Sequence, residues 1–115
     1  MTVTDHQLIE QVARDYFEAW FDGDEARMLC ALHPDLVKRR AGEQLGITTR
    51  ERMLELTRGG EGAEDGADRK LEIEVHDVHG DIASVTVRSA VYYELLHLVR
   101  TSEGWKIANA IWELV

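Results

Sequence analysis

Two pairs of side chains in the C-terminal half carry groups that acid–base or metal chemistry uses. Glu94 and His97 are three residues apart, as are His76 and His79, and both pairs fall in predicted strands. Successive side chains of a strand point to opposite faces, so residues three apart do not meet unless a bulge intervenes. A Glu94–His97 dyad is therefore disfavoured, and no metal site is predicted.

A basic cluster offers a different kind of site. Lys38-Arg39-Arg40 could hold the carboxylate or phosphate of an anionic ligand. Strand alternation turns Arg39 away from the other two, so a solvated or salt-bridged face is the favoured alternative.

Three tryptophans supply aromatic surface. Trp20, Trp105 and Trp112 are suited to stacking on a flat ring, with a place in the core or in an interface as the alternative. The sequence has no glycine-rich phosphate loop and no nucleophile elbow, so no cofactor is predicted.

The composition predicts a single acidic domain, because 115 residues are too few for two self-sufficient cores. A formal charge of −9 repels nucleic acid and anionic lipid, and neither is an expected partner. No apolar run approaches the ~20 residues of a membrane span. No secretory signal is visible, so a cytoplasmic location is expected.

Cys30 is the only cysteine and is interpreted as inert packing in a helix.

The first half of the chain predicts a helical hairpin. Thr4 and Gln7 form a capping box that begins the first helix, and Gly23 ends it. Asp24 caps a second, shorter helix that Pro34 brings to an end.

A short strand and a third helix follow. The strand covers residues 36–40, and a capping box of Thr48 and Glu51 begins the helix. Residues 59–68 contain four glycines and four carboxylates, which predicts a flexible, acidic surface loop. These carboxylates lack the spacing of a calcium-binding loop.

From Lys70 onward the apolar period changes to two, which indicates strands. Strands are predicted over residues 71–76, 82–88, 91–99 and 105–114, with turns near Gly80, Ser89 and Gly104. The predicted fold class is α+β, with three N-terminal helices packed on an antiparallel sheet. The last two strands have apolar residues on both faces, and helices can cover only one of them. We therefore expect a homodimer formed through the sheet.

Several short motifs together resemble the putative lumazine-binding family of the nuclear-transport-factor-2-like (NTF2-like) superfamily, which is also called SnoaL-like or ketosteroid-isomerase-like. The motifs are Tyr16-Phe17, Gly23-Asp24, Leu32-His33-Pro34-Asp35, Lys38-Arg39, Gly80-Asp81-Ile82-Ala83, Glu94-Leu95-Leu96-His97-Leu98 and Gly104-Trp105-Lys106-Ile107-Ala108-Asn109. The resemblance covers nearly the whole of residues 1–115 as one domain. It implies a strongly curved antiparallel sheet, a cone-shaped half-barrel with an internal pocket, and frequent dimers, but no particular activity.

The resemblance also supplies candidate catalytic residues. In ketosteroid-isomerase relatives a first-helix tyrosine stabilises an oxyanion and a carboxylate on the first strand moves a proton, and Tyr16 matches the tyrosine. The first strand of this chain carries the cations Lys38 and Arg39 where that mechanism requires the carboxylate. Scytalone-dehydratase-like relatives use a histidine with a carboxylate, which makes His33 and His97 candidates.

Three functions stay open. The first is a small-molecule-binding domain for an aromatic or heterocyclic ligand in a conical apolar pocket. The second is a cofactor-free lyase or isomerase that uses Tyr16 and a histidine, and the third is a non-catalytic dimerisation or interaction module. The candidate ligand-binding residues are Tyr16, Trp20, His33, Arg40, Tyr93, His97 and Trp112.

Overall fold

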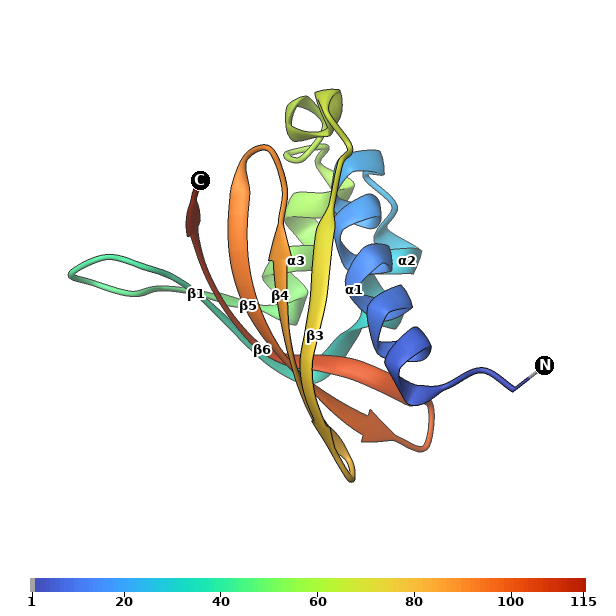
Figure 1. Ribbon diagram of the computed structural model, residues 1–115. Coiled ribbons are helices and arrows are strands. Elements are labelled where there is room, and N and C mark those ends of the chain that lie inside the picture. The colour runs from blue at the N-terminus through green and yellow to red at the C-terminus, as the bar shows by residue number, and fades with distance from the viewer. Residues whose placement is uncertain (1) are drawn as a thin grey trace.

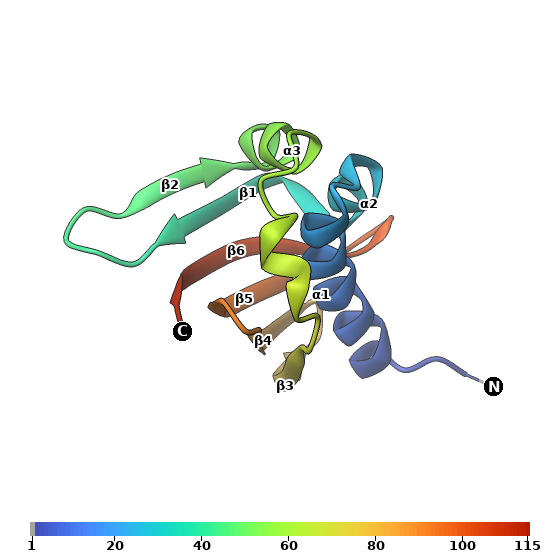
Figure 2. The same cartoon turned by 90° about the horizontal axis from the view of Figure 1, so that it is seen from above.

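The computed structural model describes residues 2–115, in which helices cover one face of a sheet (Figures 1 and 2). Over these residues the chain forms three α-helices, one short 3₁₀ helix and a six-stranded mixed sheet. The elements are α1 (Asp5–Asp22), α2 (Glu25–Ala31), β1 (Leu32–Arg40), β2 (Gly46–Thr49), α3 (Arg50–Arg58), the 3₁₀ helix η1 (Glu64–Ala67), β3 (Glu72–His79), β4 (Ile82–Arg88), β5 (Tyr92–Thr101) and β6 (Gly104–Leu114). No helix within residues 2–115 is long and apolar enough to cross a membrane.

The predicted caps of the first two helices are confirmed. Thr4 Oγ1 accepts a hydrogen bond from the Gln7 amide at 3.2 Å, and Gln7 Oε1 accepts one from the Thr4 amide at 2.9 Å. Gly23 ends α1 with a φ of 68°, which glycine adopts without steric cost. Asp24 accepts a hydrogen bond from the Arg27 amide at 3.0 Å and begins α2.

Several boundaries differ from the prediction by a few residues: β1 begins at Leu32 rather than at residue 36, and β3 ends at His79 rather than at residue 76. The second helix ends at Ala31 rather than at Pro34, and Pro34 lies inside β1. The pairing of β1 with β6 is irregular between Leu32 and Val37, and such an irregularity tolerates a residue without an amide hydrogen. The third helix is capped by Thr49, not Thr48.

The predicted antiparallel half-barrel is wrong in two respects. The strand order is β2-β1-β6-β5-β4-β3, and β1 runs parallel to β6 while the other neighbours are antiparallel. The sheet is also not strongly curled. Hairpin signals reveal only neighbours that are close in sequence, whereas β1 and β6 come from distant parts of the chain.

The short strand β2, which was not predicted, pairs with β1 in a hairpin that projects from the body of the molecule (Figure 2).

A β-bulge in β6 changes which of its side chains face the helices. His97 pairs with Asn109 and Leu98 pairs with Ile107, so Ala108 is an extra residue in β6. Unbroken alternation would place Ile107 and Ile111 on one face of the strand, but Ile107 is buried and Ile111 is exposed. Beyond the bulge, Ala110 is the buried residue instead.

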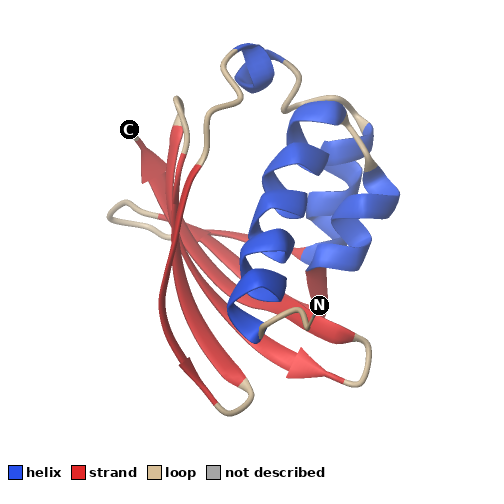
Figure 3. Cartoon of the chain, turned by 45° about the vertical axis from the view of Figure 1, so that its right-hand side comes forward, coloured by secondary structure: helices blue, strands red, loops and turns tan. Residues whose placement is uncertain are grey.

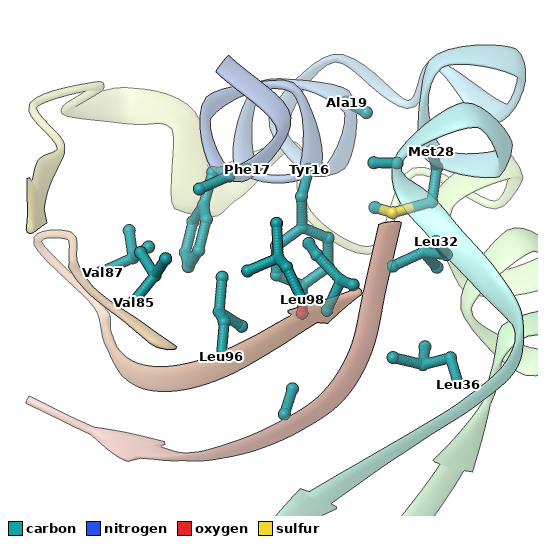
Figure 4. Packing of buried hydrophobic residues seen from close by; sticks show 14 of the residues in the cluster. Tyr16, Phe17, Ala19, Met28, Leu32, Leu36, Val85, Val87, Leu96 and Leu98 are labelled. Carbon is teal, nitrogen blue, oxygen red and sulfur yellow. The ribbon is translucent and has the colours of Figure 1, made fainter. Parts of the chain in front are cut away.

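The core lies between α1 and the inner face of the sheet (Figure 3). Tyr16 and Phe17 point from α1 toward the strands, where Val85, Leu96 and Leu98 meet them (Figure 4). These side chains recur at helical spacing on α1 and alternate along β4 and β5, so each element buries one apolar face.

Candidate functional site

A small cavity interrupts the core between α1 and the sheet. Its volume is about 100 Å³. The cavity is lined by Tyr16, Phe17 and Trp20 of α1, Lys38 of β1, Tyr92 and Glu94 of β5, and Trp112 of β6. Five of these seven residues are aromatic, and the other two carry opposite charges.

The polar residues of the cavity form one connected cluster. The Tyr16 hydroxyl lies 3.0 and 3.1 Å from the two carboxylate oxygens of Glu94, to which it donates. Lys38 Nζ donates to the Tyr16 hydroxyl oxygen at 2.6 Å and lies 3.2 Å from Glu94 Oε1. The Glu94 side chain is only 2% exposed and that of Lys38 is 12% exposed, so the charges of the pair face each other with little water between them.

The fold brings these three residues together from distant parts of the chain. Tyr16 lies on the face of α1 that packs on the sheet, in the same stripe as Trp20 one turn later. Glu94 alternates with the buried Leu96 on β5, and so it points inward. Lys38 reaches the same space because β1 runs alongside β6, where Lys38 pairs with Ala110.

Aromatic rings surround the ammonium group of Lys38. Nζ lies 5.1 Å from the ring centroid of Tyr16, 5.9 Å from that of Trp20 and 5.4 Å from that of Trp112. A cation at this distance is attracted by the electron-rich ring face. Tyr92 packs edge-on against Trp112, with 5.2 Å between the centroids, and closes one wall.

The surroundings of Tyr16 set its protonation. Burial raises the pKa of the Tyr16 hydroxyl well above its usual value, and the charge of Glu94 and the hydrogen bond to it raise it further. Tyr16 therefore keeps its proton at neutral pH and acts as a hydrogen-bond donor to Glu94.

The acidic loop lies against the aromatic wall. Asp65 accepts hydrogen bonds from Trp20 Nε1, at 3.1 Å, and from the Tyr92 hydroxyl. Burial, followed by the hydrogen bond to Asp65, raises the pKa of Tyr92 to about 12. Gly62 is buried against Trp20, so this part of the loop packs on α1 although its composition predicted a loop that does not pack.

The structure brings three of the predicted ligand-binding residues together in the cavity: Tyr16, Trp20 and Trp112. Arg40 lies beside them, with its guanidinium 4.9 Å from the ring centroid of Trp112, but does not line the cavity. His33 is part of β1, accepts a hydrogen bond from the Asp35 amide at 3.0 Å, and does not line the cavity.

The remaining candidates, Tyr93 and His97, lie on the outer face of the sheet. Both alternate along β5 with the buried Glu94 and Leu96. His97 borders an open depression of about 370 Å³ on that face. Glu94 and His97 thus point to opposite faces, as the three-residue spacing predicted.

Comparison with known proteins places the fold. The sequence model of a family described as putative lumazine-binding matches residues 4–113. The chain belongs to this family. No curated protein matches the sequence.

Solved structures similar to this member of the putative lumazine-binding family include an NTF2-like protein of unknown function from Silicibacter pomeroyi. It is 17% identical, with 100% of each chain covered and a TM-score of 0.78. An NTF2-like protein from Cytophaga hutchinsonii is 15% identical, with 98% of this chain and 100% of that chain covered and a TM-score of 0.73. A putative ketosteroid isomerase from Shewanella frigidimarina is 20% identical, with 98% and 100% covered and a TM-score of 0.62. At these identities the similarity shows the fold alone.

The sequence did not predict that Tyr16, Lys38 and Glu94 form one cluster. Lys38 was assigned to a basic surface patch, and Glu94 was considered only as a partner for a histidine. One available signal was the inward face of β5, where Glu94 is the single charged residue among Tyr92, Leu96 and Leu98. A carboxylate on a buried apolar face requires a cation or hydrogen-bond donors.

Proposed function

We propose that this domain binds a small, flat, uncharged molecule in the cavity between α1 and the sheet. The observation that supports this most strongly is the ion pair of Lys38 and Glu94, joined through Tyr16 and enclosed by aromatic side chains. Buried ion pairs contribute little net stability, because the desolvation of both charges offsets their attraction. Charged groups kept inside a cavity are therefore better explained by a ligand than by the stability of the fold.

The contacts of the cluster indicate the chemistry of the ligand. Lys38 and Glu94 already neutralise each other, so an ionic ligand would leave one charge without a partner. Trp20 and Trp112 provide walls for stacking on a ring, and Lys38 has a further N–H to donate to a ring oxygen or nitrogen.

The size of the cavity restricts the ligand. Its volume of about 100 Å³ is smaller than the ~150 Å³ of an apolar cavity that holds benzene. A single ring would therefore extend into the mouth of the cavity. A two-ring compound such as lumazine would need residues 59–68 to move away from Trp20 and Tyr92.

Tryptophan fluorescence tests the proposal. In a Trp105→Phe variant both remaining tryptophans line the cavity, because Trp105 lies elsewhere, with its Nε1 3.2 Å from Asp5. Titration with uracil, as a single-ring probe, and with lumazine should change the emission of this variant saturably.

The matched control is the double variant Trp20→Phe/Trp112→Phe, in which all tryptophan emission comes from Trp105. We expect no ligand-dependent change in its emission. If neither probe nor a wider set of single-ring heterocycles changes the emission of Trp105→Phe, the binding proposal is wrong.

We also propose that the domain is a homodimer through the outer face of the sheet. Tyr93, Leu95 and Ile111 are 41%, 48% and 39% exposed and lie side by side on β5 and β6. Apolar side chains grouped on one sheet face favour an interface over contact with water. The same feature supports the alternative of a non-catalytic interaction module, which would dimerise without binding a ligand.

The alternative of a lyase or isomerase that uses Tyr16 and a histidine has less support. Neither His33 nor His97 lines the cavity, and the polar partners of Tyr16 are Lys38 and Glu94. Any acid–base chemistry in the cavity would therefore use these two residues in place of a histidine.

A further inference from the structure

Three features of Lys38 suit a lysine that reacts as a nucleophile with Glu94 as its base. Its amino group borders the cavity, it lies largely out of water, and a carboxylate lies 3.2 Å from it. We propose that Lys38 forms an imine with a small aldehyde or ketone bound in the cavity. This inference rests on the proposed function of the same cavity and names the class of ligand.

The first step is the release of a proton from the ammonium group. An ammonium has no lone pair with which to attack a carbonyl carbon, so Lys38 must first lose a proton. Transfer of one proton from Lys38 to Glu94 gives a neutral amine, which is the nucleophile, and a neutral carboxylic acid. The 3.2 Å between Nζ and Oε1 is short enough for direct transfer.

The second step is addition to the carbonyl. The Lys38 nitrogen forms a bond to the carbonyl carbon, the carbonyl π bond breaks, and the oxygen takes up the proton that the nitrogen loses. Tyr16 lies 2.6 Å from Nζ and keeps its own proton, so its hydroxyl can donate a hydrogen bond to the developing oxyanion. The product is a carbinolamine.

The third step is the loss of water. Glu94 returns its proton to the carbinolamine hydroxyl, the carbon–oxygen bond breaks, and water leaves. The overall change converts an ammonium and a carbonyl into an iminium and one water, with no oxidant or reductant. The iminium carries the same positive charge as the ammonium did, so Glu94 is paired with a cation before and after the reaction.

The aromatic walls select the kind of carbonyl compound. Trp20 and Trp112 flank Nζ at 5.9 and 5.4 Å and would stack on a flat substituent attached to the carbonyl. A small conjugated or aromatic aldehyde or ketone without a charge satisfies both the size and the polarity of the cavity.

Reductive trapping tests the inference directly. The chain has three lysines, Lys38, Lys70 and Lys106, so each adduct can be assigned by peptide mass mapping. The protein is incubated with benzaldehyde, or with propanal as a smaller probe, in the presence of sodium cyanoborohydride. We expect Lys38 to be modified at least tenfold faster than the exposed Lys70, a modest part of the ~10²–10⁴-fold that positioned acid–base groups supply.

Variants separate the roles of the residues. Glu94→Gln should slow modification of Lys38 by about tenfold or more while modification of Lys70 stays unchanged. Lys38→Arg should remove the fast adduct, and Lys106→Arg is the matched control that should retain it. Circular dichroism checks that each variant is folded. If a variant does not fold, the comparison of Lys38 with Lys70 in the unaltered protein still tests the inference.

The outcomes distinguish this inference from the proposed function. Preferential modification of Lys38 supports the imine. Saturable fluorescence changes with uracil or lumazine, with Lys38 modified no faster than Lys70, would overturn the imine and leave ligand binding intact. The absence of both signals overturns both proposals.

Discussion

Glu94 is a buried carboxylate whose partners, Tyr16 and Lys38, come from two other elements. Removing it leaves the ammonium of Lys38 in a site with little water and no counter-charge. We expect Glu94→Leu to lower the free energy of unfolding by about 3 kcal/mol, the lower end of the range for breaking one side of a buried ion pair. Urea denaturation measures the change.

The double variant Lys38→Met/Glu94→Leu tests whether the unpaired charge is the cause. It replaces both charges with apolar groups and should recover most of the lost stability. If the double variant is as unstable as Glu94→Leu or less stable, the loss comes from packing and the ion-pair explanation is wrong.

Tyr16 makes the folded chain less stable at alkaline pH. Because its pKa is raised in the folded chain, its contribution is complete below the ordinary tyrosine pKa of about 10 and is lost as the pH rises above that value. Above about pH 10 the unfolded chain releases the proton and the folded chain keeps it, which costs about 1.4 kcal/mol per pH unit. Tyr92, with a pKa of about 12, adds to the loss up to that pH.

Denaturation measured from about pH 9 to about pH 11 should therefore show a steep fall in stability. Tyr16→Phe should reduce the slope above about pH 10 by the equivalent of one proton, whatever its effect at neutral pH. An unchanged slope in this variant would contradict the raised pKa of Tyr16.

At the scale of elements, the loop of residues 59–68 is held to α1 by close packing. A Cβ added to Gly62 would meet the carbonyl oxygen of Trp20, and would lie 2.6 Å from two atoms of its indole ring. Gly62→Ala should push the loop away from Trp20 and lower the free energy of unfolding by about 1–3 kcal/mol, as overpacking does. Thermal and urea denaturation measure the effect.

Gly46→Ala is the matched control, because a Cβ at Gly46 would lie 3.7 Å from the nearest neighbour, an ordinary contact. Its effect should be well under that of Gly62→Ala. Equal effects would show that the loop does not pack on Trp20 as described. The double variant Gly62→Ala/Trp105→Phe should also bind lumazine more tightly than Trp105→Phe alone, because the loop covers less of the mouth of the cavity.

At the scale of the whole molecule, the outer face of the sheet determines the proposed assembly. Leu95 and Ile111 are directly paired across β5 and β6. Leu95→Glu should convert the dimer to a monomer without altering the fold, because it places a charge inside the proposed interface. Sedimentation equilibrium measures the mass of each form.

Leu8→Glu is the matched control for this change, since Leu8 is 44% exposed but lies on α1, on the other side of the molecule. It should leave the assembly unchanged. A monomeric unaltered protein, or a dimer that survives Leu95→Glu, would show that the outer face of the sheet is not the interface.

Much of the fold was predictable because its signals are local. The capping box of Thr4, the left-handed Gly23 and the alternation in β3 to β5 each depend on residues within a few positions of one another. The parallel pairing of β1 with β6 and the bulge at Ala108 have no such signal, and both affect the cavity. The bulge sets the register that brings Trp112 opposite Glu94, and the parallel pairing brings Lys38 beside them.

The sequence alone determined the fold class, α+β with three helices and a C-terminal meander of strands, because helix caps and apolar periods are properties of short segments. It also named Tyr16, Trp20 and Trp112 as candidate ligand-binding residues, and these three line one cavity in the folded chain. The tertiary structure decided which face of β5 points inward and which cation meets Glu94. Those depend on contacts between residues as distant as Tyr16, Lys38 and Glu94, and only the folded chain brings their charges and rings into one cavity.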